Sequence, residues 1–311
     1  MAGAGAQFSR YKNTKMLKSG LSDTSFHAVN YTLLTLFFVA VLYPLVYVVA
    51  CSFSSANAVI ANRVWLWPVE MTAQSYRAIF EHKLLMSSYF NSLIYMVAGT
   101  SVNIALLLTC AYPLSRRDMP GYRFFTFFFL FTMFFRGGLI PDYLLVSSLK
   151  MINTRLALII PFAFSAYNMI IVRTYFANNI SGELHDAAQI DGSSDIHFFF
   201  NIALPLSKPV IAVMVLFHGI GHWNGYMRAL LYLNSSALYP LQLVLRDILF
   251  LAQMPQDVLA RMDDAKLEEL TNVMELLKYS VIVVGALPVM ILYPFVQKHF
   301  VKGIMIGSLK G

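Results

Sequence analysis

Long runs of uncharged apolar residues are the feature that most limits how this chain can fold. The first extends from about residue 26 to 53, and similar runs recur as far as about residue 296. A helix needs about 20 apolar residues to cross the hydrocarbon core of a bilayer, and it satisfies its own backbone hydrogen bonds there. Charged residues make up 13% of the 311-residue chain, which is about half of their share in soluble domains. The sequence therefore predicts an all-α, polytopic membrane protein.

We predict six transmembrane helices, and the loop charges predict on which side each loop lies. The spans cover about residues 26–53, 88–114, 124–135, 156–175, 210–233 and 273–296. Short loops rich in Lys and Arg mark the cytoplasmic side. The N-terminal tail and the loop that contains Arg116, Arg117 and Arg123 both meet this rule. We expect a cytoplasmic tail at 1–25, a six-helix transmembrane domain at 26–298 and a second cytoplasmic tail at 299–311.

The connections on the opposite side are predicted from their turn residues and polarity. Residues 54–87 and about 234–272 contain interfacial aromatic or acidic residues and are expected to form external loops. Gly137, Gly138 and Pro141 are expected to break the third span at the outer face. Residues 142–152 have a partly apolar stripe and are expected to lie along the outer surface.

The segment 181–209 is a polar interruption between two apolar runs. Ser181 can cap a short helix, Glu183 and Asp186 lie near the positive end of its dipole, and Gly192 can end it. Helical spacing places one group of residues on a common, shallow face suited to docking: Leu184, Ala187, Ala188 and Asp191. Ser193 or Ser194 can then cap a second helix, before Pro205 and Pro209 open the next span.

This segment resembles the cytoplasmic EAA loop of permease subunits in binding-protein-dependent ABC importers. The similarity includes Asp186-Ala187-Ala188-x-x-Asp191-Gly192 and the later Phe199-x-x-Ile202-x-Leu204-Pro205. In that family the loop forms a coupling helix that docks on the ATPase. The resemblance implies a coupling role for Glu183, Asp186, Ala187, Ala188, Asp191, Gly192, Phe199 and Pro205. Asp186 stands where the family usually has Glu; it keeps the charge but has a shorter reach. The alternative is a solvated helix that only links two spans.

Other segments resemble the maltose-type carbohydrate permeases, in particular the smaller subunit of a pair. These segments are FFRGGLIPDYLL at 134–145, Trp223-Asn224 with residues 230–234, and the C-terminal tail from Phe300. The resemblance implies a multi-pass protein of a prokaryotic cytoplasmic membrane, with both termini inside. It also implies several partners: a second permease subunit, two ATPase subunits, an extracytoplasmic solute-binding protein, a carbohydrate and membrane lipid.

The motifs of ATP-hydrolysing and zinc-dependent enzymes are missing from this sequence. It contains no Gly-Lys dipeptide, and hence no P-loop, and no His-Glu-x-x-His. We therefore expect no catalytic residue and no cofactor on this chain, with ATP and Mg²⁺ bound by the partner ATPase. No feature indicates a nucleic-acid partner. The two cysteines lie in or beside apolar runs and indicate neither a metal nor a redox site.

Four residues of the predicted fifth span are candidates for a substrate pathway. His218 and His222 are ionisable groups inside the membrane, which are functional candidates by default. They are either a metal pair, which would need further ligands, or hydrogen-bonded residues between helices. Trp223 could stack on a sugar ring and Asn224 could bind hydroxyls, although a Trp near a helix end also serves as an interfacial anchor.

Two arginines depart from the carbohydrate-permease motifs, in which small or uncharged residues are more common. Arg136 and Arg228 are both predicted at outer ends of spans. They are either anchors that reach water or groups that face the pathway and attract an anionic saccharide, because a guanidinium binds a carboxylate through two hydrogen bonds.

The sequence thus predicts a permease subunit that imports a sugar or oligosaccharide, with ATP hydrolysed on a separate subunit. The saccharide is expected to be acidic if the two arginines face the pathway. Two alternatives remain. One is a permease for another solute, such as phosphate or an amino acid, and the other is a membrane scaffold or sensor that docks an ATPase without transport. Neither the sugar nor its linkage is specified by the sequence.

Overall fold

The computed structural model describes residues 21–135, 137–251, 277–294 and 297. Every regular element within these ranges is helical, which confirms the predicted all-α fold. Three helices are long and apolar enough to cross a membrane: Ser25–Ser52, Lys83–Ser115 and Leu277–Pro294. Three bent helix pairs pass the same test together, so the described residues hold up to six spans, in agreement with the predicted number.

The long helix α4 (Lys83–Ser115) lies at the centre of the bundle, between α8 (Ala166–Asn179) and α12 (Lys208–Trp223). Small side chains allow close packing of helices in membranes. At Gly99 the approach is so close that an added Cβ would collide with the ring of His222 on α12. The buried face of α4 also carries several polar residues: Ser88, Asn91, Ser92, Thr100 and Asn103.

Sharp bends interrupt three of the six spans. The helices α5 (Tyr122–Phe134) and α6 (Leu139–Ser148) meet at 113°, and Gly138 between them has a φ of +87° that favours glycine. The predicted glycine break is thus confirmed. Pro141, however, lies in the first turn of α6, where its missing N–H has no helical partner to lose.

The two other bends lie before α8 and before α12. The segment of α7 (Leu156–Ile159) and the 3₁₀ turn η2 (Ile160–Phe162) meets α8 at 52°. The chain from α10 (Asp195–Phe198) through the π-helical turn η3 (Phe199–Ala203) to α11 (Leu204–Leu206) meets α12 at 78°. The second bend brings α10 and η3 against the end of α4, where Phe198 and Phe199 lie next to Tyr112.

The structure corrects the prediction for residues 210–251 in two respects. The fifth span is not continuous, because α12 ends at Trp223 and a separate helix, α13 (Tyr226–Tyr232), follows Gly225. The following segment is not simply a loop, because it contains the turn η4 (Ser236–Leu238) and then α14 (Leu241–Leu251). Leu241, Val244 and Leu245 share one helical face and pack with Leu277 and Val281. The acidic part of the predicted loop lies outside the described residues.

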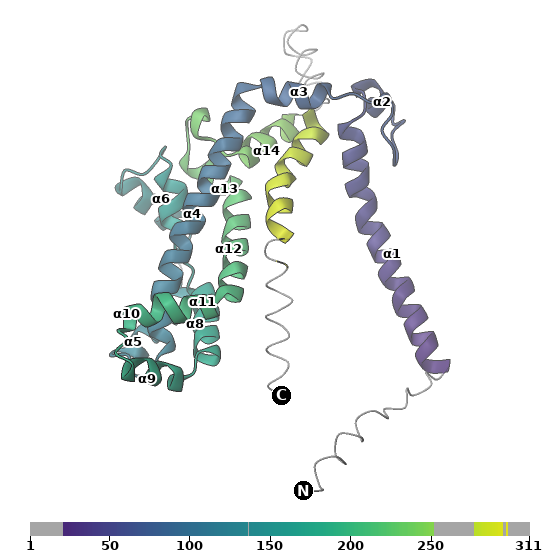
Figure 1. Ribbon diagram of the computed structural model, residues 1–311. Coiled ribbons are helices and arrows are strands. Elements are labelled where there is room, and N and C mark those ends of the chain that lie inside the picture. The colour runs from purple at the N-terminus through teal and green to yellow at the C-terminus, as the bar shows by residue number, and fades with distance from the viewer. Residues whose placement is uncertain (1–20, 136, 252–276, 295–296, 298–311) are drawn as a thin grey trace.

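The helix α1 (Leu21–Ser52) stands apart from the bundle along most of its length (Figure 1). Only its last turns pack, where Ala50 and Cys51 contact α2 (Ala56–Ile60) and Val64. Figure 1 places α2 and α3 (Gln74–Glu81) at one end of α4, whereas α9 (Gly182–Ile190) and α10 lie at the other end. The molecule therefore has two distinct polar ends, joined by apolar helices.

Candidate functional site

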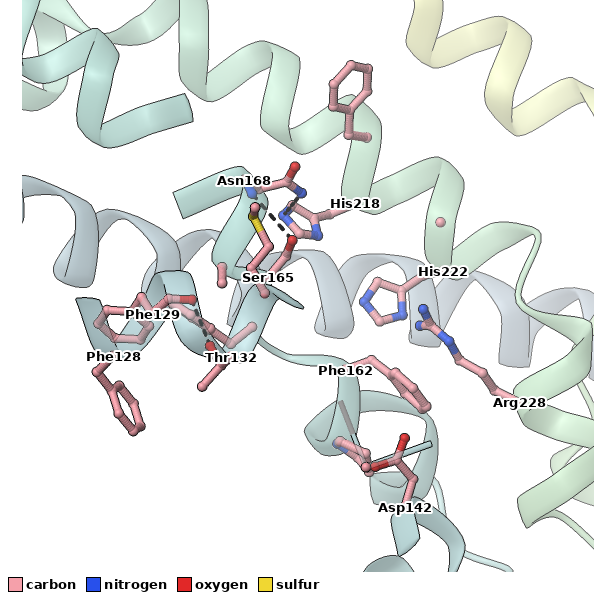
Figure 2. Close-up of a pocket in the computed structure, with 17 residues that line it drawn as sticks. Phe128, Phe129, Thr132, Asp142, Phe162, Ser165, Asn168, His218, His222 and Arg228 are labelled. Carbon is pink, nitrogen blue, oxygen red and sulfur yellow. Dashed lines mark hydrogen bonds between the residues drawn. The ribbon is translucent and has the colours of Figure 1, made fainter. Parts of the chain in front are cut away.

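A cavity of about 640 Å³ lies among α5, α6, η2, α8, α12 and α13. Its wall combines aromatic rings with a few polar side chains that converge on one space (Figure 2). Three of the predicted pathway residues line it, namely His218, His222 and Arg228. A cavity of this size, with a few polar groups in an apolar wall, is typical of small-ligand sites.

Two of the other predicted pathway residues lie elsewhere in the structure. Trp223 and Asn224 line a separate pocket of about 520 Å³ next to Gly285. Trp223 is buried, and its Nε1–H donates to the backbone oxygen of Gly285 at 2.9 Å. Consecutive residues of a helix point about 100° apart, so His222 and Trp223 face different spaces. Arg136 lies outside the described residues.

Amides hold both histidine rings in place. His222 Nε2 lies 2.7 Å from Asn103 Oδ1, and Asn103 Nδ2 donates to the backbone oxygen of Phe162 at 2.9 Å. His218 Nε2 lies 3.2 Å from Asn168 Nδ2. No cluster that could hold a metal ion occurs among the described residues. The geometry agrees with hydrogen-bonded histidines between helices, which was one of the two interpretations of the sequence.

Arg228 contributes the only cationic side chain to the described lining of this cavity. Its guanidinium carbon lies 3.8 Å above the centre of the Phe162 ring, a cation–π contact. The side chain is half-buried and directed into the cavity, beside His222 (Figure 2). A role as an outward-facing anchor does not fit this position.

The second candidate site is the loop 181–209, at the far end of α4. Ser181 Oγ accepts a hydrogen bond from the Leu184 N–H at 3.3 Å, and Ser194 Oγ accepts one from the His197 N–H at 3.2 Å. Gly192 has a φ of +81° between the two helices. The predicted order of capped helix, glycine turn and capped helix is therefore confirmed.

The outward face of α9 differs from the prediction at one position. Glu183, Asp186, Ala187 and Asp191 are exposed, as is Ile190, whose side chain is 87% exposed. Ala188 instead is buried and belongs to a core cluster with Phe198. The expectation that Ala188 shares the exposed face was wrong, because the tertiary contacts of α9 turn the face that carries His185 and Ala188 toward the bundle.

The remaining predicted coupling residues differ in exposure. Phe199 is partly buried, and its ring centre lies 4.9 Å from that of Tyr112 on α4. Pro205 is exposed on the short helix α11. Phe199 thus contacts the bundle, and Pro205 lies at its surface.

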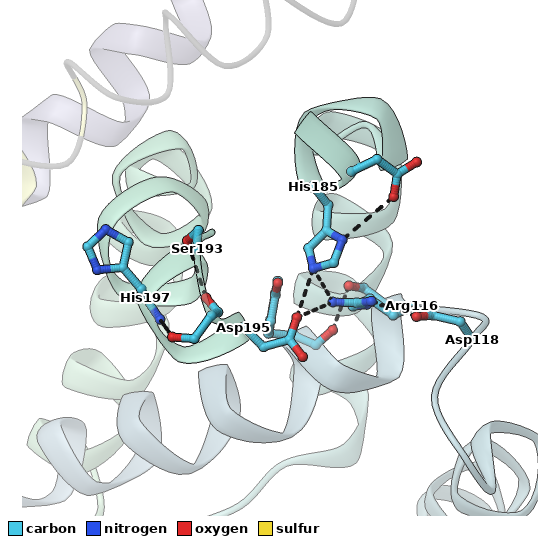
Figure 3. A network of polar contacts seen from close by, with 10 residues as sticks. Arg116, Asp118, His185, Ser193, Asp195 and His197 are labelled. Carbon is cyan, nitrogen blue, oxygen red and sulfur yellow. Dashed lines mark hydrogen bonds and ion pairs between the residues drawn. The ribbon is translucent and has the colours of Figure 1, made fainter. Parts of the chain in front are cut away.

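A polar network fixes this loop to the end of α4 (Figure 3). Arg116 donates to Asp118 through Nε at 3.2 Å and Nη2 at 2.6 Å, and to Asp195 Oδ1 through Nη1 at 2.8 Å. His185 Nε2 lies 2.8 Å from the same Asp195 oxygen. One side chain at the end of α4 therefore joins α10 directly and α9 through His185.

The carboxylates of this network are stabilised in their charged form. The hydrogen bond with His185, followed by that from Arg116, lowers the pKa of Asp195. The hydrogen bonds from Arg116 likewise lower the pKa of Asp118. In the sequence, Arg116 indicated only the side of the membrane on which its loop lies, and neither His185 nor Asp195 was predicted as a site residue. Arg116 and His185 are 69 residues apart, and a contact over that distance leaves no local pattern in the sequence.

Similarity to known proteins extends over most of the chain. The model of the family described as "Binding-protein-dependent transport system inner membrane component" matches residues 11–306. The polygalacturonan/rhamnogalacturonan transport system permease protein YtcP of Bacillus subtilis (strain 168) is 39% identical over 291 residues, which cover 94% of this chain and 100% of that protein. Protein LplC of the same organism is 40% identical over 268 residues, or 86% of this chain and 89% of LplC.

A solved structure shares the fold of this chain. It is the crystal structure of a bacterial ABC transporter involved in the import of the acidic polysaccharide alginate. One of its chains aligns with a TM-score of 0.82 and 34% identity, over 90% of this chain and 98% of that chain.

Proposed function

Because the chain belongs to the family of inner membrane components of binding-protein-dependent transport systems, and is thus a permease subunit of an ABC importer, we propose that it imports an acidic oligosaccharide. The observation that carries this substrate class is the cavity, whose wall consists of aromatic rings and of polar side chains that amides hold in place. The wall includes the cation Arg228, which forms no ion pair with any described residue. The names of two similar proteins support the same class, since one belongs to a polygalacturonan/rhamnogalacturonan transport system and the other to an importer of alginate.

The energy for transport comes, in this proposal, from a separate ATPase that binds the exposed face of α9. Glu183, Asp186 and Asp191 offer carboxylates to basic groups of that subunit, and the small side chain of Ala187 allows close approach. ATP and Mg²⁺ are bound by the ATPase. Arg116 then connects the loop to α4, so a displacement of α9 moves α4 and the helices packed on it.

The complete importer contains further subunits in this proposal. A second permease subunit completes the pathway, two ATPase subunits bind the two coupling loops, and an extracytoplasmic solute-binding protein delivers the saccharide. The chain lies in the cytoplasmic membrane with both termini inside, since the α9 end of the bundle must face the ATPase.

Transport by the reconstituted complex tests this function. The complex of both permeases and the ATPase would be placed in proteoliposomes with its solute-binding protein, and uptake of labelled trigalacturonate would be measured with and without ATP. We expect ATP-dependent uptake of the saccharide and none of phosphate or amino acids. Uptake of one of those solutes without saccharide uptake contradicts the substrate class. ATPase binding without any uptake favours the scaffold alternative.

A further inference from the structure

We propose that Arg228 and His222 form a subsite for one uronate residue in the cavity of this chain. Arg228 binds the carboxylate, and His222 accepts a hydrogen bond from a ring hydroxyl of the same sugar. The inference rests on the proposed function and adds which side chains of this subunit distinguish an acidic sugar from a neutral one.

Within the described ranges, the positive charge of Arg228 has no anionic protein partner. A guanidinium stays charged inside a membrane protein, and its burial is costly unless it is paired or faces water. Among the described residues Arg228 forms no ion pair, and its side chain stacks on Phe162. Asp142 lines the same cavity but forms no ion pair with Arg228, whose guanidinium lies over the Phe162 ring. The cavity therefore offers a cation for which an anionic ligand is the natural partner.

The guanidinium of Arg228 keeps one edge free for a ligand. Stacking on Phe162 occupies one face of the planar group. The N–H donors of arginine lie in the plane of that group, so its edge remains available. Two of these parallel N–H groups match the two oxygens of a carboxylate. A lysine at this position would supply charge without that geometry.

The hydrogen bonds around His222 determine which of its ring nitrogens carries the proton. The Phe162 carbonyl can only accept, so the Asn103 side chain must direct its Nδ2 toward it and its Oδ1 toward His222. His222 Nε2 is therefore the donor to that oxygen. In the neutral ring, Nδ1 is then an acceptor, and it has no partner among the described residues.

The cavity wall thus places the N–H donors of Arg228 next to one acceptor, the Nδ1 atom of His222. A uronate residue carries a carboxylate and hydroxyl groups on one ring, so it can satisfy both side chains at once. A neutral hexose has a hydroxymethyl group in place of the carboxylate and leaves the guanidinium without an anion. Hydrogen bonds to a charged partner are about twice as strong as neutral ones, so Arg228 contributes most of the discrimination.

Transport by variants of the full complex tests the proposal. The probes are trigalacturonate and its methyl ester, which has the same hydroxyl groups but no charge. For each complex, uptake into proteoliposomes is measured with the same solute-binding protein, and the result is the ratio of acid to ester uptake. Because every variant is tested with the same solute-binding protein, the preference of that protein for one probe affects all variants equally. This preference is measured separately, as the binding of both probes by the isolated protein.

We expect Arg228→Gln to lower the acid-to-ester ratio about tenfold, in line with the loss of a charge-assisted hydrogen bond. Arg228→Lys should retain part of the preference, because it retains the charge. His222→Phe should lower uptake of both probes and leave their ratio unchanged. Arg77→Gln is the matched control, because Arg77 is exposed on α3 outside the cavity. Recovery of the intact complex on size-exclusion chromatography would show that each variant assembles.

An unchanged ratio in an assembled Arg228→Gln complex would overturn the subsite. A lower ratio in His222→Phe would overturn the division of roles between the two residues. Failure of the proposed function gives a different result, since the unmodified complex would then transport neither probe.

Discussion

Arg116 connects three segments of the chain through a single side chain. It pairs with Asp118 beyond the end of α4 and with Asp195 at the start of α10, and Asp195 also contacts His185 of α9. The carboxylates are largely exposed, so each pair contributes at most about 1 kcal/mol to stability. The main effect of the network is therefore to position α9 relative to α4.

We expect Arg116→Gln to reduce substrate-stimulated ATP hydrolysis severalfold while the complex still assembles. The change removes both ion pairs and leaves the fold of the bundle in place. The measurement is ATPase activity of the purified complex with and without loaded solute-binding protein. Arg117→Gln is the control, because Arg117 is the exposed neighbour of Arg116. Equal stimulation in the two variants would remove the network from the coupling path.

The Asp195 carboxylate has a predictable pH dependence. The pKa of Asp195 is lowered in the folded protein. The stability that its carboxylate contributes is therefore fully present above the usual carboxyl pKa of about 4, and it is lost only as the pH falls through the lowered pKa of the folded state. The loss of stimulation in Asp195→Asn should therefore be the same at about pH 8 and about pH 9, which both lie above the usual pKa ranges of carboxyl and imidazole groups. A loss confined to one of these pH values would show that another group controls the link.

At the scale of elements, the packing of α4 on α12 depends on the absence of a side chain at Gly99. A Cβ there would collide with His222, whereas one at Gly219 would meet its nearest atom at an ordinary 3.8 Å. We expect Gly99→Ala to destabilise the bundle by about 1–3 kcal/mol, and Gly219→Ala to have little effect. The midpoint of thermal aggregation of the purified complex would measure both. A Gly99→Ala complex as stable as the Gly219→Ala complex would show that the two helices can separate without cost.

The turn between α9 and α10 depends on backbone conformation, not on space. Gly192 has a φ of +81°, and a Cβ added to it would meet no atom within 4 Å. A β-branched residue is strained there by about 1–3 kcal/mol, whereas Asn tolerates this region. We expect Gly192→Val to leave the protein inserted but to reduce stimulated ATP hydrolysis, and Gly192→Asn to retain most of it. Gly182→Ala is a control, since Gly182 has free space and no positive φ. Equal activity of all three variants would exclude the turn from coupling.

In the complete molecule, helix α1 is apolar on all sides and has no side that packs on the bundle along most of its length. Large side chains are exposed all around it, including Tyr31 at 67% and Phe37 at 70%. Such a helix is buried by lipid or by a neighbouring subunit. Because the bundle covers only its last turns, α1 is a surface on which a second permease could pack.

We expect the chain expressed alone to be degraded faster than the chain co-expressed with its second permease. Pulse-chase labelling would give both half-lives, and co-expression with an unrelated permease would be the control. Pairing with a different subunit also predicts that the active complex contains one copy of this chain. Isolation of an active complex with this chain as its only permease would contradict the heteromeric assembly.

The features that could be predicted from the amino-acid sequence are those that depend on short-range chemistry. Hydropathy predicted the all-α membrane fold and the approximate spans, since about 20 apolar residues suffice to cross a bilayer. Ser181, Gly192 and the pair Ser193 and Ser194 marked the boundaries of α9 and α10, and the structure assigns the second cap to Ser194. Such boundaries can be predicted because caps and left-handed turns act over a few residues. The spacing of the loop motif was enough to indicate the family to which the chain belongs.

Which side chains meet across the bundle could be learned only from the packing of the helices. His222 and Asn103 are 119 residues apart, and no local pattern records that their helices touch at Gly99. The same packing turned Ala188 inward, and directed His222 and Trp223 into different spaces. Helical periodicity specifies which residues share a face, but the neighbouring helices determine where that face points. The cavity and the Arg116 network therefore follow from packing among distant segments.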